Sequence, residues 1–151
     1  MEILKATFED LSEILELQKL AYISEAQLLN DFSIKPLTQT LEEFQAEFIK
    51  YDKDVILKLI NEKNKIIGSV RAHEENNRIL IGRLIVHPDY QRNGYGTMLL
   101  KTIETYFENK VFELFTSSKS ERNINLYKKS GYKEFKRQKI NQKYEFVYME
   151  K

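Results

Sequence analysis

The sequence predicts a mixed α/β (α+β) fold in which one twisted, mostly antiparallel sheet of about seven strands is flanked by about four helices. Three apolar, β-branched runs follow one another at residues 55–60, 65–73 and 79–86, separated by short polar turns that suit hairpins. The third run leads into a helix-periodic segment and then into another apolar run at 111–116. Strand, helix and strand in this order imply a right-handed crossover and a parallel pair, so the sheet is expected to be mixed.

The first part of the chain opens with a short apolar alternation at residues 2–6, which predicts the first strand. A capping pair, Thr7 with Asp10, precedes an amphipathic helix with apolar positions at Leu11, Ile14, Leu15 and Tyr22. Residues 23–39 are expected to be irregular and to end around Pro36. A stronger capping box, Thr40 with Glu43, then begins a second helix with apolar positions at Leu41, Phe44 and Phe48.

The last part of the chain is predicted to hold two more helices and three strands. One helix begins near Tyr95 and has apolar positions at Leu99, Ile103, Tyr106 and Phe107. A buried strand follows at Val111 to Thr116, and another helix, capped by Ser118 or Ser120, runs to Lys129 and ends at Gly131. Two closing strands are expected at residues 132–137 and 143–150, the latter alternating tyrosine and phenylalanine with other residues.

Composition narrows the classes of function. The 151 residues, 42% of them hydrophobic, suit one domain over residues 1–151, and no linker or repeat divides them. The 24 basic and 23 acidic side chains give no strong field, so neither nucleic acid nor a membrane is expected as the main partner. With no cysteine and two histidines, a metal site is not expected. No signal peptide or membrane span is apparent, and we expect a cytoplasmic protein.

The stretch from His87 to Leu99 holds two of the five glycines and one of the two prolines. A tight loop that opens a helix presents unpaired backbone N–H groups at the positive end of the helix dipole, and glycines let an anion approach them. This favours phosphate binding, although a turn whose glycines only adopt positive φ is the simpler reading of a lone Gly-x-Gly. No Gly-Lys-Ser/Thr follows, and Leu99 stands where a dinucleotide fingerprint needs a third glycine.

Three segments together resemble the GNAT superfamily of acyl-CoA-dependent N-acyltransferases. The Gln/Arg-x-x-Gly-x-Gly/Ala signature of that family matches Gln91-Arg92-Asn93-Gly94-Tyr95-Gly96. The preceding segment 84–90 is similar to its Leu-x-Val-x-Pro-x-Tyr motif, and 125–132 to its Leu-Tyr-x-x-x-Gly-Phe/Tyr motif. The resemblance implies a GNAT-like fold and acetyl-CoA as co-substrate, bound where the fourth and fifth strands splay apart.

By the same resemblance, the cofactor would be held mainly by the backbone. Main-chain groups of Leu84, Ile85 and Val86 would pair with the pantetheine arm. Amides of the loop would hold the pyrophosphate: Gln91, Arg92, Asn93, Gly94, Tyr95, Gly96 and Thr97. Relatives often contact the cofactor through an asparagine at the position of Ser120 here, and Asn123, one helical turn before Tyr127, is a possible substitute. The basic side chains that could reach the 3′-phosphate are Arg92, Arg122, Lys128 and Lys129.

Tyr127 occupies the position of the family's general acid, which lies beside the thioester sulfur; without the neighbouring motif it would read as a tyrosine packed on the sheet. The base is less clear, because Arg83 stands where many relatives have a glutamate. Arg83 could attract a carboxylate or phosphate of the acceptor, or it could pair with an acidic side chain. Alternatives for the base are His73, Glu74, Glu75 or a chain of waters.

The expected function is direct transfer of an acetyl group from acetyl-CoA to a primary amine within a ternary complex, with no covalent enzyme intermediate. The acceptor, a small-molecule amine or a peptide or protein amine, would meet the segment 22–36. There Glu25 and Asp31 could bind the cationic amine beside Tyr22 and Phe32. A non-catalytic acyl-CoA-binding or regulatory domain is the alternative. The chain is expected to be a monomer or a homodimer.

Overall fold

The computed structural model describes residues 1–151, which form one seven-stranded sheet with five α-helices. The strands are β1 (Glu2–Lys5), β2 (Val55–Ile60), β3 (Ile66–Glu75), β4 (Arg78–Val86), β5 (Val111–Ser117), β6 (Lys133–Lys139) and β7 (Glu145–Glu150). The helices are α1 (Leu11–Leu29), α2 (Lys35–Thr38), α3 (Leu41–Lys50), α4 (Tyr95–Glu104) and α5 (Glu121–Lys129). Two 3₁₀ turns, η1 (Phe8–Asp10) and η2 (Pro88–Tyr90), complete the elements.

The sheet has the strand order β1-β2-β3-β4-β5-β7-β6. Every neighbouring pair is antiparallel except β4 and β5, which are parallel and joined through α4. This confirms the mixed, mostly antiparallel sheet and the crossover that the sequence predicts. None of the helices combines the length and the apolar character that crossing a membrane would need.

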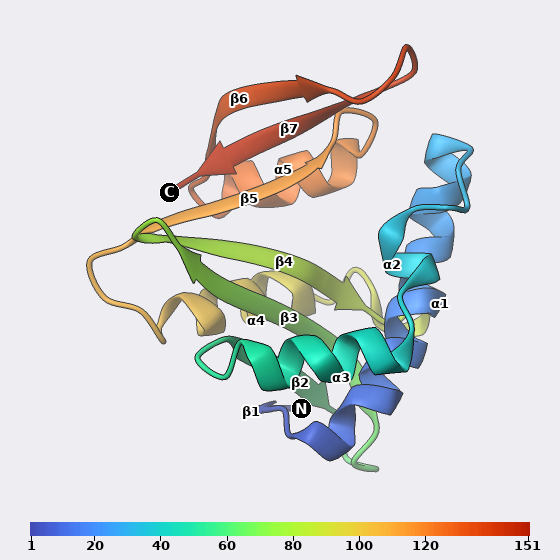
Figure 1. The fold of residues 1–151 in the computed structure, drawn as a ribbon, viewed down its shortest axis with the longest axis vertical. Coiled ribbons are helices and arrows are strands. Elements are labelled where there is room, and N and C mark those ends of the chain that lie inside the picture. The colour runs from blue at the N-terminus through green and yellow to red at the C-terminus, as the bar shows by residue number, and fades with distance from the viewer.

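Two hydrophobic clusters, one on each face of the sheet, hold the layers together. The larger cluster packs α4 and α5 against the sheet, with Leu99, Ile103 and Tyr127 among its members. The smaller one packs α1 and α3 on the opposite face, with Leu11 and Phe44 among its members. Figure 1 shows α3 in front of the strands and α4 and α5 behind them.

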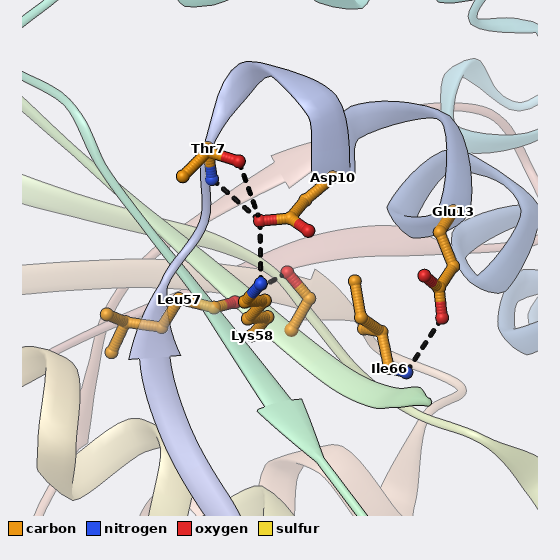
Figure 2. A network of polar contacts seen from close by, with 7 residues as sticks. Thr7, Asp10, Glu13, Leu57, Lys58 and Ile66 are labelled. Carbon is orange, nitrogen blue, oxygen red and sulfur yellow. Dashed lines mark hydrogen bonds and ion pairs between the residues drawn. The ribbon is translucent and has the colours of Figure 1, made fainter. Parts of the chain in front are cut away.

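A polar clasp fixes the start of α1 on the sheet (Figure 2). The carboxylate of Asp10 accepts hydrogen bonds from the Thr7 backbone N–H and hydroxyl and lies 2.9 Å from Lys58 Nζ on β2. One turn later, Glu13 accepts the Ile66 N–H at 2.8 Å, at the edge of a register shift between β2 and β3. The capping pair predicted from sequence thus also anchors α1, and the rest of the helix extends toward β4.

Two predicted elements differ from the structure. Residues 23–29, expected to be irregular, continue α1, and 35–38 form the short helix α2. The continuation follows from burial, since Ala26 and Leu29 extend the apolar face until Asn30 ends the helix with φ 51°. Near the middle of the chain, α4 ends at Glu104, so Tyr106 and Phe107 lie in the turn after it.

Candidate active site

The sheet opens between β4 and β5. The two strands pair only at Arg78–Val111, Ile79–Phe112 and Leu80–Glu113. Beyond these pairs β4 stays with β3 and β5 stays with β7, so the edges that face each other diverge, as Figure 1 shows. Leu84, Ile85 and Val86, the residues expected to pair with the pantetheine arm, lie on this open edge of β4.

A β-bulge lies on the same stretch of β4. Ser69 pairs with Ile85 and Arg71 with Gly82, so Val70 of β3 stands opposite two residues, Arg83 and Leu84. Arg83 occupies the left-handed region with φ 50°, which costs a non-glycine residue on the order of 1 kcal/mol. Strained backbone of this kind tends to gather at functional sites.

The loop that opens α4 presents a row of free backbone donors. None of the seven consecutive N–H groups of residues 91–97 donates to another protein group; the first one that does is that of Met98, to the carbonyl of Gly94 at 3.0 Å. Gly94 is the N-cap of α4 with φ 79°, and Arg92 has φ 67°. These amides stand at the positive end of a ten-residue helix, which is a favourable place for a phosphate.

Glycine is required at the two loop positions for different physical reasons. Gly94 has positive φ, while a Cβ there would meet nothing within 4 Å, so its constraint is conformational. A Cβ on Gly96 would lie 3.3 Å from Leu126 Cδ1, so this glycine lets α5 pack closely on α4. Gln91 ties the loop down, because its amide nitrogen donates to the Val86 carbonyl and its oxygen accepts from Arg122.

Tyr127 reaches the opening from α5. Only 8% of the residue is exposed. Its hydroxyl makes no hydrogen bond to the protein. The hydroxyl oxygen is not enclosed, so the exposed part of the Tyr127 side chain includes it. Burial raises the pKa of Tyr127 well above its ordinary value, and Tyr22 and Glu25 raise it further. The phenol therefore remains protonated at neutral pH, which suits a hydrogen-bond or proton donor.

Helix α1 supplies the opposite wall of this opening. Gln18, Tyr22 and Glu25 recur at a spacing of four and three residues and so lie on one face of the helix. Both carboxylate oxygens of Glu25 accept from the Ser120 hydroxyl, at 2.7 and 2.9 Å. Ser120 precedes α5 but makes no side-chain capping bond of its own, because its hydroxyl serves Glu25. This contact joins helices from opposite faces of the sheet.

The other predicted candidates lie at varied distances from this opening. The amide of Asn123 donates to the Thr116 hydroxyl at 3.2 Å, which holds Asn123 beside β5. His73 Nδ1 lies 2.6 Å from Asp54 Oδ1. His73 pairs with Leu80 of β4, in the region where β4 and β5 are still paired. Beside it, Glu74 pairs with Lys110, and Glu75 ends β3. The structure therefore does not bring the three proposed bases to Tyr127.

The residues that the sequence suggested for binding the acceptor amine do not all lie together in the structure. Tyr22 and Glu25 lie on α1 at the opening, whereas Asp31 bonds Ser33 at the surface and Phe32 is 58% exposed. Sequence reasoning missed Arg71, a cation in the middle of the apolar strand β3 whose guanidinium stacks on Phe44 at 3.9 Å. A charge within an apolar run was the available signal.

Comparison with known proteins agrees with this geometry. The model of the acetyltransferase (GNAT) family matches residues 12–132. A curated protein of Bacillus subtilis (strain 168), UPF0157 protein YqkA, is 29% identical over 124 residues; these are 80% of this chain but 34% of that protein, so the chain spans about a third of its relative.

Solved structures share the fold at low sequence identity. The PaiA N-acetyltransferase of Thermoplasma acidophilum, in complex with coenzyme A, has a TM-score of 0.81 and 19% identity, covering 99% of this chain and 97% of that one. The ribosomal-protein-alanine N-acetyltransferase of Brucella melitensis has a TM-score of 0.78 and 20% identity, covering 100% and 99%. By its sequence and its fold, this chain belongs to the acetyltransferase (GNAT) family.

Proposed function

We propose that this chain transfers an acetyl group from acetyl-CoA directly to a primary amine within a ternary complex. The observation that carries the proposal is the row of free amides at residues 91–97, which begins α4 beside the open edge of β4. A diphosphate needs such donors, and an extended pantetheine arm needs an unpaired strand edge. The coenzyme A complex of the Thermoplasma acidophilum neighbour supports the same choice of co-substrate.

The residues present fit the co-substrate in three places. Amides of Gln91 to Thr97 would bind the pyrophosphate, and main-chain groups of Leu84 to Val86 would pair with pantetheine. Arg122 lies 2.8 Å from Gln91 at the loop and is the basic side chain best placed for a further phosphate. Asn123, held beside β5 and one turn before Tyr127, would line the arm.

Tyr127 would act on the leaving group. When the amine nitrogen attacks the thioester carbonyl, a carbon–nitrogen bond forms, the carbon–sulfur bond breaks, and the sulfur departs with the electron pair. The Tyr127 hydroxyl, kept protonated by burial, would donate a hydrogen bond and then its proton to that sulfur, and solvent would return the proton to the phenolate. The backbone N–H of Leu84 or Val86 would polarise the carbonyl oxygen.

Glu25 would receive the acceptor amine. An amine with a pKa near ~10.4 arrives protonated and must release a proton before it attacks. Glu25 is the carboxylate that stands between α1 and α5, bonded to Ser120, and its charge acts on Tyr127. It would attract the ammonium group to the opening, and the proton would leave to water along the exposed side of the site.

A screen of primary amines that follows release of free coenzyme A from acetyl-CoA tests the proposal. We expect turnover with at least one amine and acetyl-CoA binding that Gly94→Val weakens at least tenfold by calorimetry. Lys133→Ala, on the exposed strand β6, is the matched control and should bind normally. Transfer to none of a broad set of amines would reject the enzyme, and unchanged binding by a folded Gly94→Val protein would reject the loop as the phosphate site.

The alternative is a non-catalytic acyl-CoA-binding domain. The observation that favours it is Arg83, which replaces the acid that the resemblance leads us to expect on β4. This alternative predicts tight acetyl-CoA binding without transfer to any amine. Rapid turnover with any acceptor would exclude it.

A further inference from the structure

Two arginines from neighbouring strands converge on the face of the sheet that α1 and α3 cover. Arg71 of β3 pairs with Gly82 of β4, so the two residues point to the same face, and the stacking of Arg71 on Phe44 identifies that face. Ile81 and Leu84 both pack into the cluster on the opposite face. The bulge between them therefore turns Arg83 to the same side as Gly82 and Arg71.

These two cations lack an anion of their own. Arg83 makes no ion pair and meets only the neutral hydroxyl of Tyr22, and Arg71 makes one hydrogen bond, to the neutral amide of Gln18. The Nε atoms of both arginines are enclosed and unpaired. Glu47 acts on Arg71 only at longer range, and its carboxylate accepts from Gln39. Natural structures rarely leave buried charged groups without partners.

Open space lies beside the pair. Gly82 stands directly opposite Arg71 and next to Arg83, and a Cβ built on it would meet no atom within 4 Å. The terminal nitrogens of Arg83 are not enclosed, so they reach accessible space. The Tyr22 hydroxyl of α1 meets the Arg83 guanidinium, so α1 lies beside this open space.

Helix α1 runs from this pair of arginines to the proposed site of transfer. Along one face of α1, Gln18 contacts Arg71, Tyr22 follows one turn later, and Glu25 contacts Ser120 beside α5. Arg83 reaches Tyr22, and only three residues of helix, on the order of 5 Å along the axis, separate Tyr22 from Glu25. A small molecule can span a positive end and a negative end at this separation.

We propose that the acceptor is a small amine that also carries a carboxylate or phosphate group, with the anion held by Arg83 and Arg71 and the ammonium held by Glu25. This inference rests on the proposed function. Arginine is suited to the task because its planar fork binds such oxyanions through two parallel hydrogen bonds. Filling the space over Gly82 with an anion would also relieve the repulsion between the two guanidinium groups.

Paired acceptors that differ only in the anionic group test the proposal at fixed ionic strength. Phenylalanine against phenethylamine tests carboxylate, and phosphoethanolamine against ethanolamine tests phosphate. We expect kcat/KM to be about 10- to 100-fold higher for the anionic member of at least one pair, as a charged hydrogen-bonded contact provides. Arg83→Gln should bring the ratio of kcat/KM between the anionic and the neutral member down toward one, through KM of the anionic member. Arg137→Gln, on the exposed strand β6, is the control and should keep the preference.

The outcomes separate the inference from the function on which it rests. If transfer occurs without preference for the anionic member of either pair, or if Arg83→Gln keeps the preference, the inference is wrong and the enzyme remains. If no amine is acetylated, the proposed function fails, and calorimetry with phenylalanine and with inorganic phosphate decides about the anion site. Binding to the native protein that Arg83→Gln abolishes supports it; no binding to the native protein overturns it.

Discussion

Two buried tyrosines allow catalysis and stability to be separated by the same chemical change. Tyr127 and Tyr132 lie with ring centroids 6.2 Å apart and are both buried. The Tyr132 hydroxyl donates to Glu104 at 2.6 Å, whereas the Tyr127 hydroxyl makes no hydrogen bond to the protein. Replacing either residue by phenylalanine keeps the ring and removes one oxygen.

The expected magnitudes are opposite for the two variants. Tyr127→Phe should lower kcat by about 10²- to 10⁴-fold, the usual contribution of a positioned proton donor, and should leave stability nearly unchanged. Tyr132→Phe removes a hydrogen bond to a charged group, worth about 1.5–3 kcal/mol. For a chain of this size, that loss corresponds to a Tm about 3–12 °C lower. Its kcat should stay near that of the native protein.

The assay is release of coenzyme A at saturating acetyl-CoA with the best acceptor from the screen, run beside thermal unfolding of each variant. The acid role of Tyr127 would be refuted by a Tyr127→Phe protein that turns over within threefold of the native rate. An equal loss of kcat in Tyr132→Phe would show that the effect arises from packing around the rings rather than from the hydroxyl at the opening.

Four further substitutions test the loop before α4, the polar contacts at the start of α1 and the proposed anion site. Gly94→Ala should lower stability by about 1–2 kcal/mol through positive φ alone, and a urea titration measures this; Gly96→Ala should instead perturb packing on Leu126. Asp10→Asn should destabilise the protein at pH 7 and have little effect near pH 2. Burial raises the pKa of Asp10, but the hydrogen bonds from Thr7 and the charge of Lys58 outweigh it, so the net effect lowers the pKa. The Asp10 carboxylate therefore stabilises the fold above its ordinary pKa, and this contribution disappears as pH falls. Equal losses of stability in Asp10→Asn at both pH values would contradict this assignment. Gly82→Val should fill the open space beside the two arginines, so KM for an anionic acceptor should rise while Tm stays within a few degrees. An unchanged KM would argue against this space as the anion site.

The local elements were predictable because their signals are local. The capping box at Thr40 and the apolar run of residues 55–60 depend on neighbours in sequence, and α3 and β2 follow them. The extension of α1 was not predictable, because polar residues interrupt its apolar pattern and only tertiary packing buries Ala26 and Leu29. The loop before α4 could be located because its glycines are concentrated in one short segment.

The wall of the candidate site could not be read from the sequence, because it depends on pairs distant in the chain. Glu25 and Ser120 are 95 residues apart and meet only where β4 and β5 diverge. Arg71 and Arg83 share a face only because one extra residue in β4 reverses the alternation, and a strict two-residue period would send Arg83 to the α4 side.

The bulge also explains how an arginine can take part in the proposed site at this position of β4. The resemblance leads us to expect a glutamate there, and a cation at that point cannot attract an ammonium group. In the proposed site the carboxylate comes from α1 instead, where Glu25 accepts hydrogen bonds from Ser120 on the other face of the sheet. The charges along the opening then run from negative at Glu25 to positive at Arg83. An acceptor with one charge of each sign matches both ends, whereas a simple alkylamine would leave the arginines without a partner.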